Sequence, residues 1–147
     1  TIAQIVALAV FLPVLAGQSG NTGCQALAIT LRGITLGELG DFPVKKLITK
    51  ELILGALNGF IVGLVAGAAM WIYAAGTGAG SPPMLAFVIL VAMTGACMCS
   101  GLFGVMVPLT LQKCGADPAM ASSIFLTTMT DIVGMGLMLA LATAMVL

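Results

Sequence analysis

The chain has 147 residues, of which 61% are hydrophobic and 7% are charged, and its formal net charge is zero. A soluble domain of this length could not cover so much apolar side chain with a polar surface, and no basic stretch indicates nucleic-acid binding. We therefore expect an all-α membrane protein, a polytopic helix bundle in a lipid bilayer. About four crossings of roughly 20 residues fill residues 1–147 and leave no room for a separate soluble domain.

The composition also argues against catalysis and against soft-metal chemistry. Histidine is absent, and no nucleophile stands beside a base, so the chain is not expected to be an enzyme. Cys97 and Cys99 have C-x-C spacing without a second ligand pair, and the four cysteines suggest no disulfide framework. Packing within the membrane is the expected role of the cysteines.

The first predicted crossing, residues 1–36, contains a polar interruption. Residues 17–25 combine three glycines with polar side chains that include Asn21 and Gln25. At membrane depth, unpaired backbone groups are costly unless they face protein or water. Glycine permits an opened turn that exposes carbonyl oxygens to a cation, or a close approach of another helix. Asn21 and Gln25 favour the interpretation as a site, although packing remains the alternative.

Charge is concentrated in residues 37–51, which hold six of the ten formal charges. The charged residues are Glu38, Asp41, Lys45, Lys46, Lys50 and Glu51. We expect this stretch to lie outside the hydrocarbon, either as a short interfacial helix after Pro43 or as a solvated loop.

The second predicted crossing, residues 52–75, has a glycine at every fourth position. The glycines are Gly55, Gly59, Gly63 and Gly67. This spacing places them on one helical stripe and predicts a tight contact with another helix. Trp71 and Tyr73, near the end of the segment, are expected at a membrane interface.

The third predicted crossing, residues 84–108, follows an uncharged turn at 76–83. Pro108 is expected to end or kink this helix. Residues 109–117 form the next connection, in which Asp117 before Pro118 is typical of a helix N-cap followed by the first helical residue.

The last predicted crossing, residues 118–147, carries a single charge, Asp131. A carboxylate at the centre of a bilayer costs about 2.5–3.5 kcal/mol on insertion scales, so it normally faces a bundle interior or a water-filled path. Small polar residues share its side of the helix, namely Ser123, Thr127, Thr130 and Gly134. The stripe suits an ion pathway, while close helix packing around a structural Asp131 is the alternative.

Loop charges predict the orientation. The connections 37–51 and 109–117 lie on one side of the membrane and carry four lysines, whereas the connection 76–83 carries none. The positive-inside rule makes the lysine side cytoplasmic and both termini of this chain external. We expect a preceding crossing, and a cytoplasmic region before it, in a longer protein.

Three separated motifs resemble the transmembrane domain of the MgtE-type magnesium channels. They are Pro13-Val14-Leu15-Ala16-Gly17-Gln18-Ser19-Gly20-Asn21-Thr22-Gly23-Cys24-Gln25, the stretch Pro108 to Ala119 ending in Gly115-Ala116-Asp117-Pro118-Ala119, and Thr127 to Gly134 with Asp131. The motifs occur in the same order and cover essentially the whole chain.

This resemblance implies a five-helix domain, here without its first helix, that forms a homodimer around a central pore. In the family, the carboxylate matching Asp131 faces a hydrated Mg²⁺, assisted by backbone carbonyls near positions matching Gly17, Gly20 and Thr127. Asn21 lies in the first of the three motifs, directly after Gly20. Cys24 departs from the family pattern, because many members carry a second asparagine there.

The chemistry of the residues agrees with a magnesium pathway. Mg²⁺ prefers six oxygen ligands and sheds water reluctantly, so one carboxylate per subunit with hydroxyl and amide groups can hold it through its waters. The alternatives are transport of another divalent cation, an ion-coupled secondary transporter that binds a small solute at residues 17–23, and a non-conducting assembly subunit.

Overall fold

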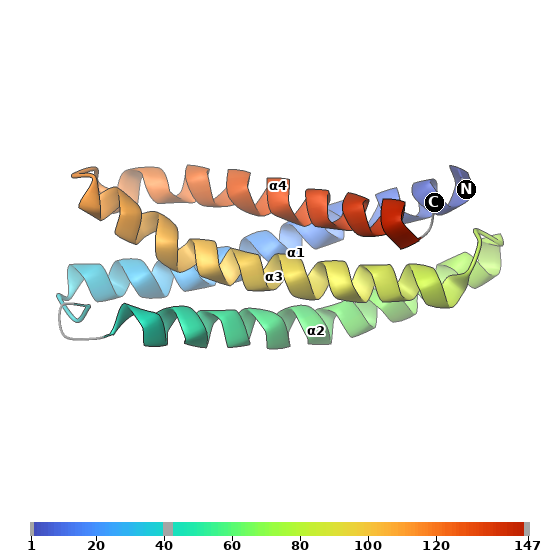
Figure 1. Ribbon diagram of the computed structural model, residues 1–147, viewed down its shortest axis with the longest axis horizontal. Helices are drawn as coiled ribbons and strands as arrows, with labels where there is room; N and C mark the ends of the chain where they lie inside the picture. Colours follow the sequence, from blue (N-terminus) through green and yellow to red (C-terminus); the bar gives the residue numbers. More distant parts are fainter. Residues whose placement is uncertain (1, 40–42, 146–147) are drawn as a thin grey trace.

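The computed structural model describes residues 2–39 and 43–145, which form four long helices. They are α1 (Ile2–Thr35), α2 (Val44–Thr77), α3 (Pro82–Lys113) and α4 (Pro118–Met145). The α1–α2 and α3–α4 connections lie at one end of the bundle, and the α2–α3 turn lies at the other end with both termini (Figure 1). The described ranges contain no strand, and the predicted all-α membrane fold is confirmed.

Three stretches of the described residues are long and apolar enough to cross a membrane: α2, α3 and Ser122–Met145 within α4. α1 has 34 residues and runs along the whole bundle (Figure 1). At about 1.5 Å of rise per residue, such a helix is about 50 Å long, which exceeds a hydrocarbon core of about 30 Å. α2 and α3 accordingly extend beyond the predicted spans 52–75 and 84–108 at both ends. The outermost predicted span residues, 1 and 146–147, lie outside the described ranges.

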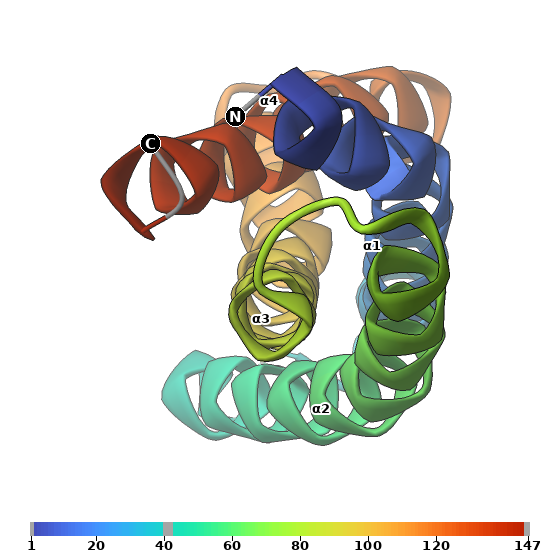
Figure 2. The same ribbon diagram turned by 90° about the vertical axis from the view of Figure 1, so that its right-hand side faces the viewer.

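α3 is the central helix of the bundle, because it packs against α1, α2 and α4 (Figure 2). α2 and α4 lie on different sides of it and do not contact each other within the described residues. The core side chains of α3 are fully buried and mainly apolar, among them Leu85, Val88, Ile89, Ala92, Met93, Ala96, Cys97 and Val105. The position of every other helix is therefore set largely by α3.

The glycine stripe of α2 packs tightly against α3, as predicted. A Cβ atom added at Gly59 would lie 2.7 Å from the carbonyl oxygen of Met93, and one at Gly55 would lie 2.5 Å from that of Cys97. Such distances leave no room for a side chain, so the glycines allow the two backbones to touch.

The helix ends follow local rules. α2 is followed by Gly78 in the left-handed conformation (φ 65°), and its N–H donates to the carbonyl of Ala74. At the start of α4, Oδ1 of Asp117 accepts a hydrogen bond of 2.9 Å from the N–H of Ala119, which confirms the predicted N-cap. Pro108 does not end α3: it lies buried within the helix, whose last turns bend towards α4 (Figure 1).

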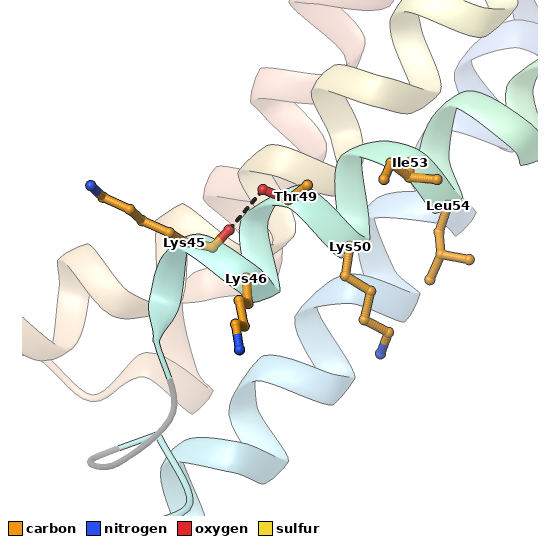
Figure 3. Close-up of a pocket in the computed structure, with 6 residues that line it drawn as sticks. All are labelled: Lys45, Lys46, Thr49, Lys50, Ile53 and Leu54. Atoms are coloured by element: carbon orange, nitrogen blue, oxygen red, sulfur yellow. Dashed lines mark hydrogen bonds between the residues drawn. The ribbon is translucent and has the colours of Figure 1, made fainter.

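The charged stretch 37–51 differs from both predicted alternatives. Lys45, Lys46 and Lys50 lie on the first two turns of α2 itself, with Lys45 directed away from the other two (Figure 3). These residues form neither a separate interfacial helix nor a loop. Asp41 lies outside the described residues.

Glu51 was expected outside the hydrocarbon with the rest of the charged stretch, which stays a prediction, but the structure packs this residue against neighbouring helices. Glu51 is only 5% exposed and lies inside the helix bundle. The reason is tertiary: a Cβ at Gly101 of α3 would lie 2.6 Å from the Glu51 carbonyl oxygen, so the two backbones are in direct contact there. α2 therefore continues past Glu51 as a helix packed against α3.

Candidate ion site between α1 and α4

α1 is continuous through its polar interruption. The hydroxyl of Ser19 donates to the carbonyl of Ala16 at 3.1 Å, and that of Thr22 donates to the carbonyl of Gln18 at 3.0 Å. The opened turn considered for residues 17–25 is therefore not formed. An intact helix keeps every backbone group paired at membrane depth, which is the less costly solution.

The glycines of α1 have different surroundings. A Cβ at Gly23 would lie 3.1 Å from the side chain of Leu126, so Gly23 allows α4 to approach. At Gly17 and Gly20 no heavy atom lies within 4 Å of such a Cβ. Gly17 and Asn21 are exposed, and Gly20 is partly exposed. The packing interpretation thus holds for Gly23, whereas the face with Gly17, Gly20 and Asn21 is open within this chain.

The polar stripe of α4 is also divided. Thr130 and Gly134 are buried in the bundle, whereas Ser123 and Thr127 are exposed. Asp131 lies between the two groups and is half-buried. Within the described residues its carboxylate has neither a hydrogen bond nor an ion pair. The structural alternative for Asp131, a paired polar group, is therefore not supported by the contacts of this chain.

Packing of α1 on α4 brings the predicted site residues to one level. A Cβ at Gly134 would lie 3.0 Å from Leu15 and 3.6 Å from the hydroxyl oxygen of Ser19. Gly23 and Leu126 meet further along the same pair of helices. Asp131 lies between these two contacts in sequence, so it is level with residues 17–21. A carboxylate, an amide and two open glycines therefore lie at one height beside the contact of α1 with α4.

The hydroxyl and carbonyl groups near Asp131 can act as oxygen ligands. The hydroxyl of Thr127 donates to the carbonyls of Ser123 and Ile124, at 3.0 and 3.2 Å, which leaves its oxygen lone pairs free. Thr127's own carbonyl accepts from the hydroxyl of Thr130 at 3.0 Å. The described residues contain no group of three or more His, Cys, Asp or Glu side chains that could hold a metal ion. The site thus suits a hard cation that keeps its waters better than a dehydrated one.

One polar residue that the sequence interpretation missed is Glu51. It lies one turn before Gly55 and therefore extends the every-fourth-residue stripe of α2 by one position. This spacing predicts that Glu51 faces α3. The lysines beside it instead indicated an exposed stretch, so the prediction was not made.

The chain matches the MgtE family, described as divalent cation transporters, over residues 12–141. The chain belongs to this family. It is 30% identical to the magnesium transporter MgtE of Bacillus subtilis over 97% of its length, and 34% identical to the protein of the same name from Enterococcus faecalis over 85%. Identity to the magnesium transporter MgtE of Thermus thermophilus is 30% over 94% of the chain.

The chain spans 30%, 26% and 29% of the length of these three MgtE relatives, respectively. The match therefore concerns the segment that forms the helical bundle. All three relatives are named as magnesium transporters.

Proposed function

We propose that this chain forms the conducting part of a magnesium transporter, in which hydrated Mg²⁺ crosses the membrane along a pore at a homodimer axis. One observation carries the proposal: within the described residues Asp131 is an unpaired, half-buried carboxylate beside the contact of α1 with α4, in a chain of the MgtE family. An unpaired charge in a membrane helix is costly, and a passing cation would offset that cost.

The proposed ligands act mainly through water. Asp131 supplies the charge, Asn21 supplies an amide, and the carbonyl oxygens of Gly17 and Gly20 accept hydrogen bonds from the waters of the ion. Thr127 accepts them through its hydroxyl oxygen, because its carbonyl already accepts from the hydroxyl of Thr130. Helix carbonyls keep a second lone pair for such bonds, so an intact α1 is compatible with this role. Weak contacts through water also let the ion leave again.

Two copies of the chain are proposed to face each other across the open face of α1. A single Asp131 offers one negative charge, whereas two copies related by a two-fold axis offer two, which matches a divalent ion. The absence of neighbours at Gly17 and Gly20 among the described residues supports this arrangement, because that face is left for water or for a second copy.

A coupled carrier is less well supported. That alternative needed a broken helix at residues 17–23 to hold a solute, and α1 is continuous there. The lysine end of the bundle is proposed to face the cytoplasm, by the positive-inside rule.

The proposal is tested by Asp131→Asn in the full chain reconstituted in liposomes. We expect Mg²⁺ uptake, followed with an entrapped fluorescent indicator, to fall to the level of protein-free liposomes, because the isosteric amide removes the charge and little volume. Size-exclusion chromatography checks that the variant keeps its fold and assembly. Uptake at the wild-type rate by the folded variant would refute the role of Asp131.

The same liposomes separate a channel from a carrier. With a channel, the Mg²⁺ current reverses at the magnesium equilibrium potential whatever the proton gradient. A reversal potential that moves with the proton gradient would contradict the pore.

A further inference from the structure

A second polar cavity lies between α1 and α2, away from Asp131. It has a volume of about 300 Å³. Thr22 and Gln25 of α1 and Glu51 and Asn58 of α2 line it, together with apolar side chains. Thr22 and Gln25 are three residues apart and Glu51 and Asn58 seven, so each pair shares one side of its helix. Four oxygen-bearing side chains from two helices thus meet in one space, here called the α1–α2 cavity.

Among the described residues, Glu51 is the only charged one that lines this cavity, and its Oε1 has no hydrogen-bond partner. Oε1 is buried and accepts no hydrogen bond within the described residues. The nearest cation is the Nζ of Lys50, at 3.7 Å, which is beyond hydrogen-bonding distance, and the Lys50 side chain is 57% exposed. Burying a carboxylate is costly unless it is paired and hydrogen-bonded. Oε1 therefore has a largely exposed lysine at ion-pair distance but no hydrogen-bond donor among the described residues, so the demand of this buried carboxylate is only partly met.

Glu51 cannot relieve this demand by moving with its helix. The backbone of α2 touches α3 at Gly101, beside the Glu51 carbonyl, and again at Gly55, beside Cys97. These contacts fix α2 at Glu51 and one turn after it. A rigid mounting of this kind holds the charged group in the cavity, as a binding site requires.

The α1–α2 cavity is separate from the candidate site at Asp131. At about 100° per residue, Thr22 lies about 140° around α1 from Gly17 and Gln25 lies about 80° from it, although Gln25 is only one turn beyond Asn21. Asp131 belongs to α4, which does not contact α2 within the described residues and lies on the far side of α3 from it (Figure 2).

The size and the ligand set of the cavity match a hard cation with water. A volume of about 300 Å³ corresponds to roughly ten waters at about 30 Å³ each, enough for an ion and its first shell. The carboxylate, two amide carbonyls and a hydroxyl are oxygen donors of the kind that Mg²⁺ and Mn²⁺ prefer. With a single carboxylate, the ion would keep several of its waters.

We infer that the α1–α2 cavity is a second cation site, which binds a partly hydrated divalent ion through Glu51, with Gln25, Asn58 and Thr22 as further oxygen ligands. The identity of the ion as Mg²⁺ rests on the proposed function, whereas the existence of the site rests on the cavity alone. A bound ion joins α1 to α2 at a place where few other contacts do so.

The test counts Mn²⁺ bound to the purified full chain, from the loss of the free-ion signal in electron paramagnetic resonance, with Mg²⁺ as competitor. We expect Glu51→Gln to lose one Mn²⁺ per chain relative to the wild type. Glu38→Gln, which changes an exposed acid near the same end of the bundle, serves as the matched control and should lose none. Asp131→Asn should retain the ion at Glu51, so failure of this site and failure of the proposed pore are distinguishable.

Two further variants exclude a purely structural role of Glu51. Lys50→Gln removes the competing cation at 3.7 Å, so Mn²⁺ should bind at least about threefold more tightly. Asn58→Leu keeps the charge and the helix but removes an oxygen ligand, so it should weaken binding severalfold. Unchanged Mn²⁺ stoichiometry in folded Glu51→Gln, or weaker binding in Lys50→Gln, would overturn the inference.

Discussion

At the scale of single residues, charge in this chain is sparse, and its position carries most of the functional information. Asp131 is half-buried beside the contact of α1 with α4 without a partner in the described residues, while Glu51 is buried between α1, α2 and α3 with one free oxygen. Asp131 departs from the rule that membrane helices avoid unpaired charge, and Glu51 is a buried carboxylate that has an ion pair with Lys50 but no hydrogen bond to its Oε1. Such violations are expected at functional sites.

Asn21 provides a test of the second ligand group. It is exposed on the open face of α1. We expect Asn21→Ala to reduce the preference for Mg²⁺ over Ca²⁺ about 3- to 10-fold, since one hydrogen bond to the ion's water shell is worth about 0.5–1.5 kcal/mol. Competition assays in liposomes measure this preference.

Cys24 is the matched control for Asn21, because it is exposed on the same side of α1, one turn away. Cys24→Asn restores the residue common in the family and should preserve flux and stability. Unaltered selectivity in Asn21→Ala would remove Asn21 from the site, and a large loss of flux in Cys24→Asn would show that the family correspondence is locally wrong.

At the scale of helices, local sequence patterns predicted those features that depend on residues close together in the sequence, such as glycine spacing and helix caps. The glycines of α2 and the Asp117 cap of α4 are where their spacing placed them. The local sequence did not determine three other features, namely the continuity of α1, the continuation of α3 past Pro108 and the burial of Glu51. In each case a helix continues where the local sequence favours a break, because packing on a neighbour and the need to pair backbone groups outweigh it.

The candidate site was predictable only in part for the same reason. Gly17, Gly20 and Gly23 recur at every third position, yet of these three only Gly23 packs against α4 within the described residues. Likewise, Thr127 and Thr130 seemed to share one stripe, but one is exposed and the other buried. Each step of three residues turns a helix by about 60°, so the side on which α1 meets α4 decides which of these residues are covered, and that side is a property of the assembled bundle.

The contact of α2 with α3 gives a prediction for stability. Gly59→Val inserts a branched side chain where a Cβ alone would lie 2.7 Å from a backbone oxygen, so it should destabilise the bundle by about 1–3 kcal/mol or more. The midpoint of thermal unfolding in detergent measures the effect. Gly76→Ala, with no atom within 4 Å of the added Cβ, is the control and should be neutral or stabilising. Equal midpoints for the two variants would contradict the close contact.

At the scale of the whole molecule, the proposed orientation and dimer follow from which ends and faces are exposed. Cys114 is exposed at the lysine end, directly after α3. If that end is cytoplasmic, a membrane-impermeant maleimide should label Cys114 in inside-out vesicles but not in intact cells. Cys114→Ser identifies the labelled site, and labelling of intact cells would reverse the orientation.

The dimer is tested with Cys24, which is exposed on the open face of α1. If two copies face each other there, a short bifunctional thiol reagent should join them in a Cys114→Ser background. The product should disappear in the Cys24→Ser variant. Cross-linking that persists without Cys24 would place the subunit contact elsewhere.

The central position of α3 has a consequence for biogenesis. α1 packs mainly on α3 and α4, which are synthesised after it, and only sparsely on α2. α1, which carries the buried hydroxyl residues Ser19, Thr22 and Thr30, is therefore made before its two main partners. Until α3 is inserted, Ser19 and Thr22 can satisfy their hydroxyls only on their own helix, as they do in the finished bundle. Those intrahelical hydrogen bonds keep the polar segment of α1 compatible with lipid before α3 and α4 are inserted.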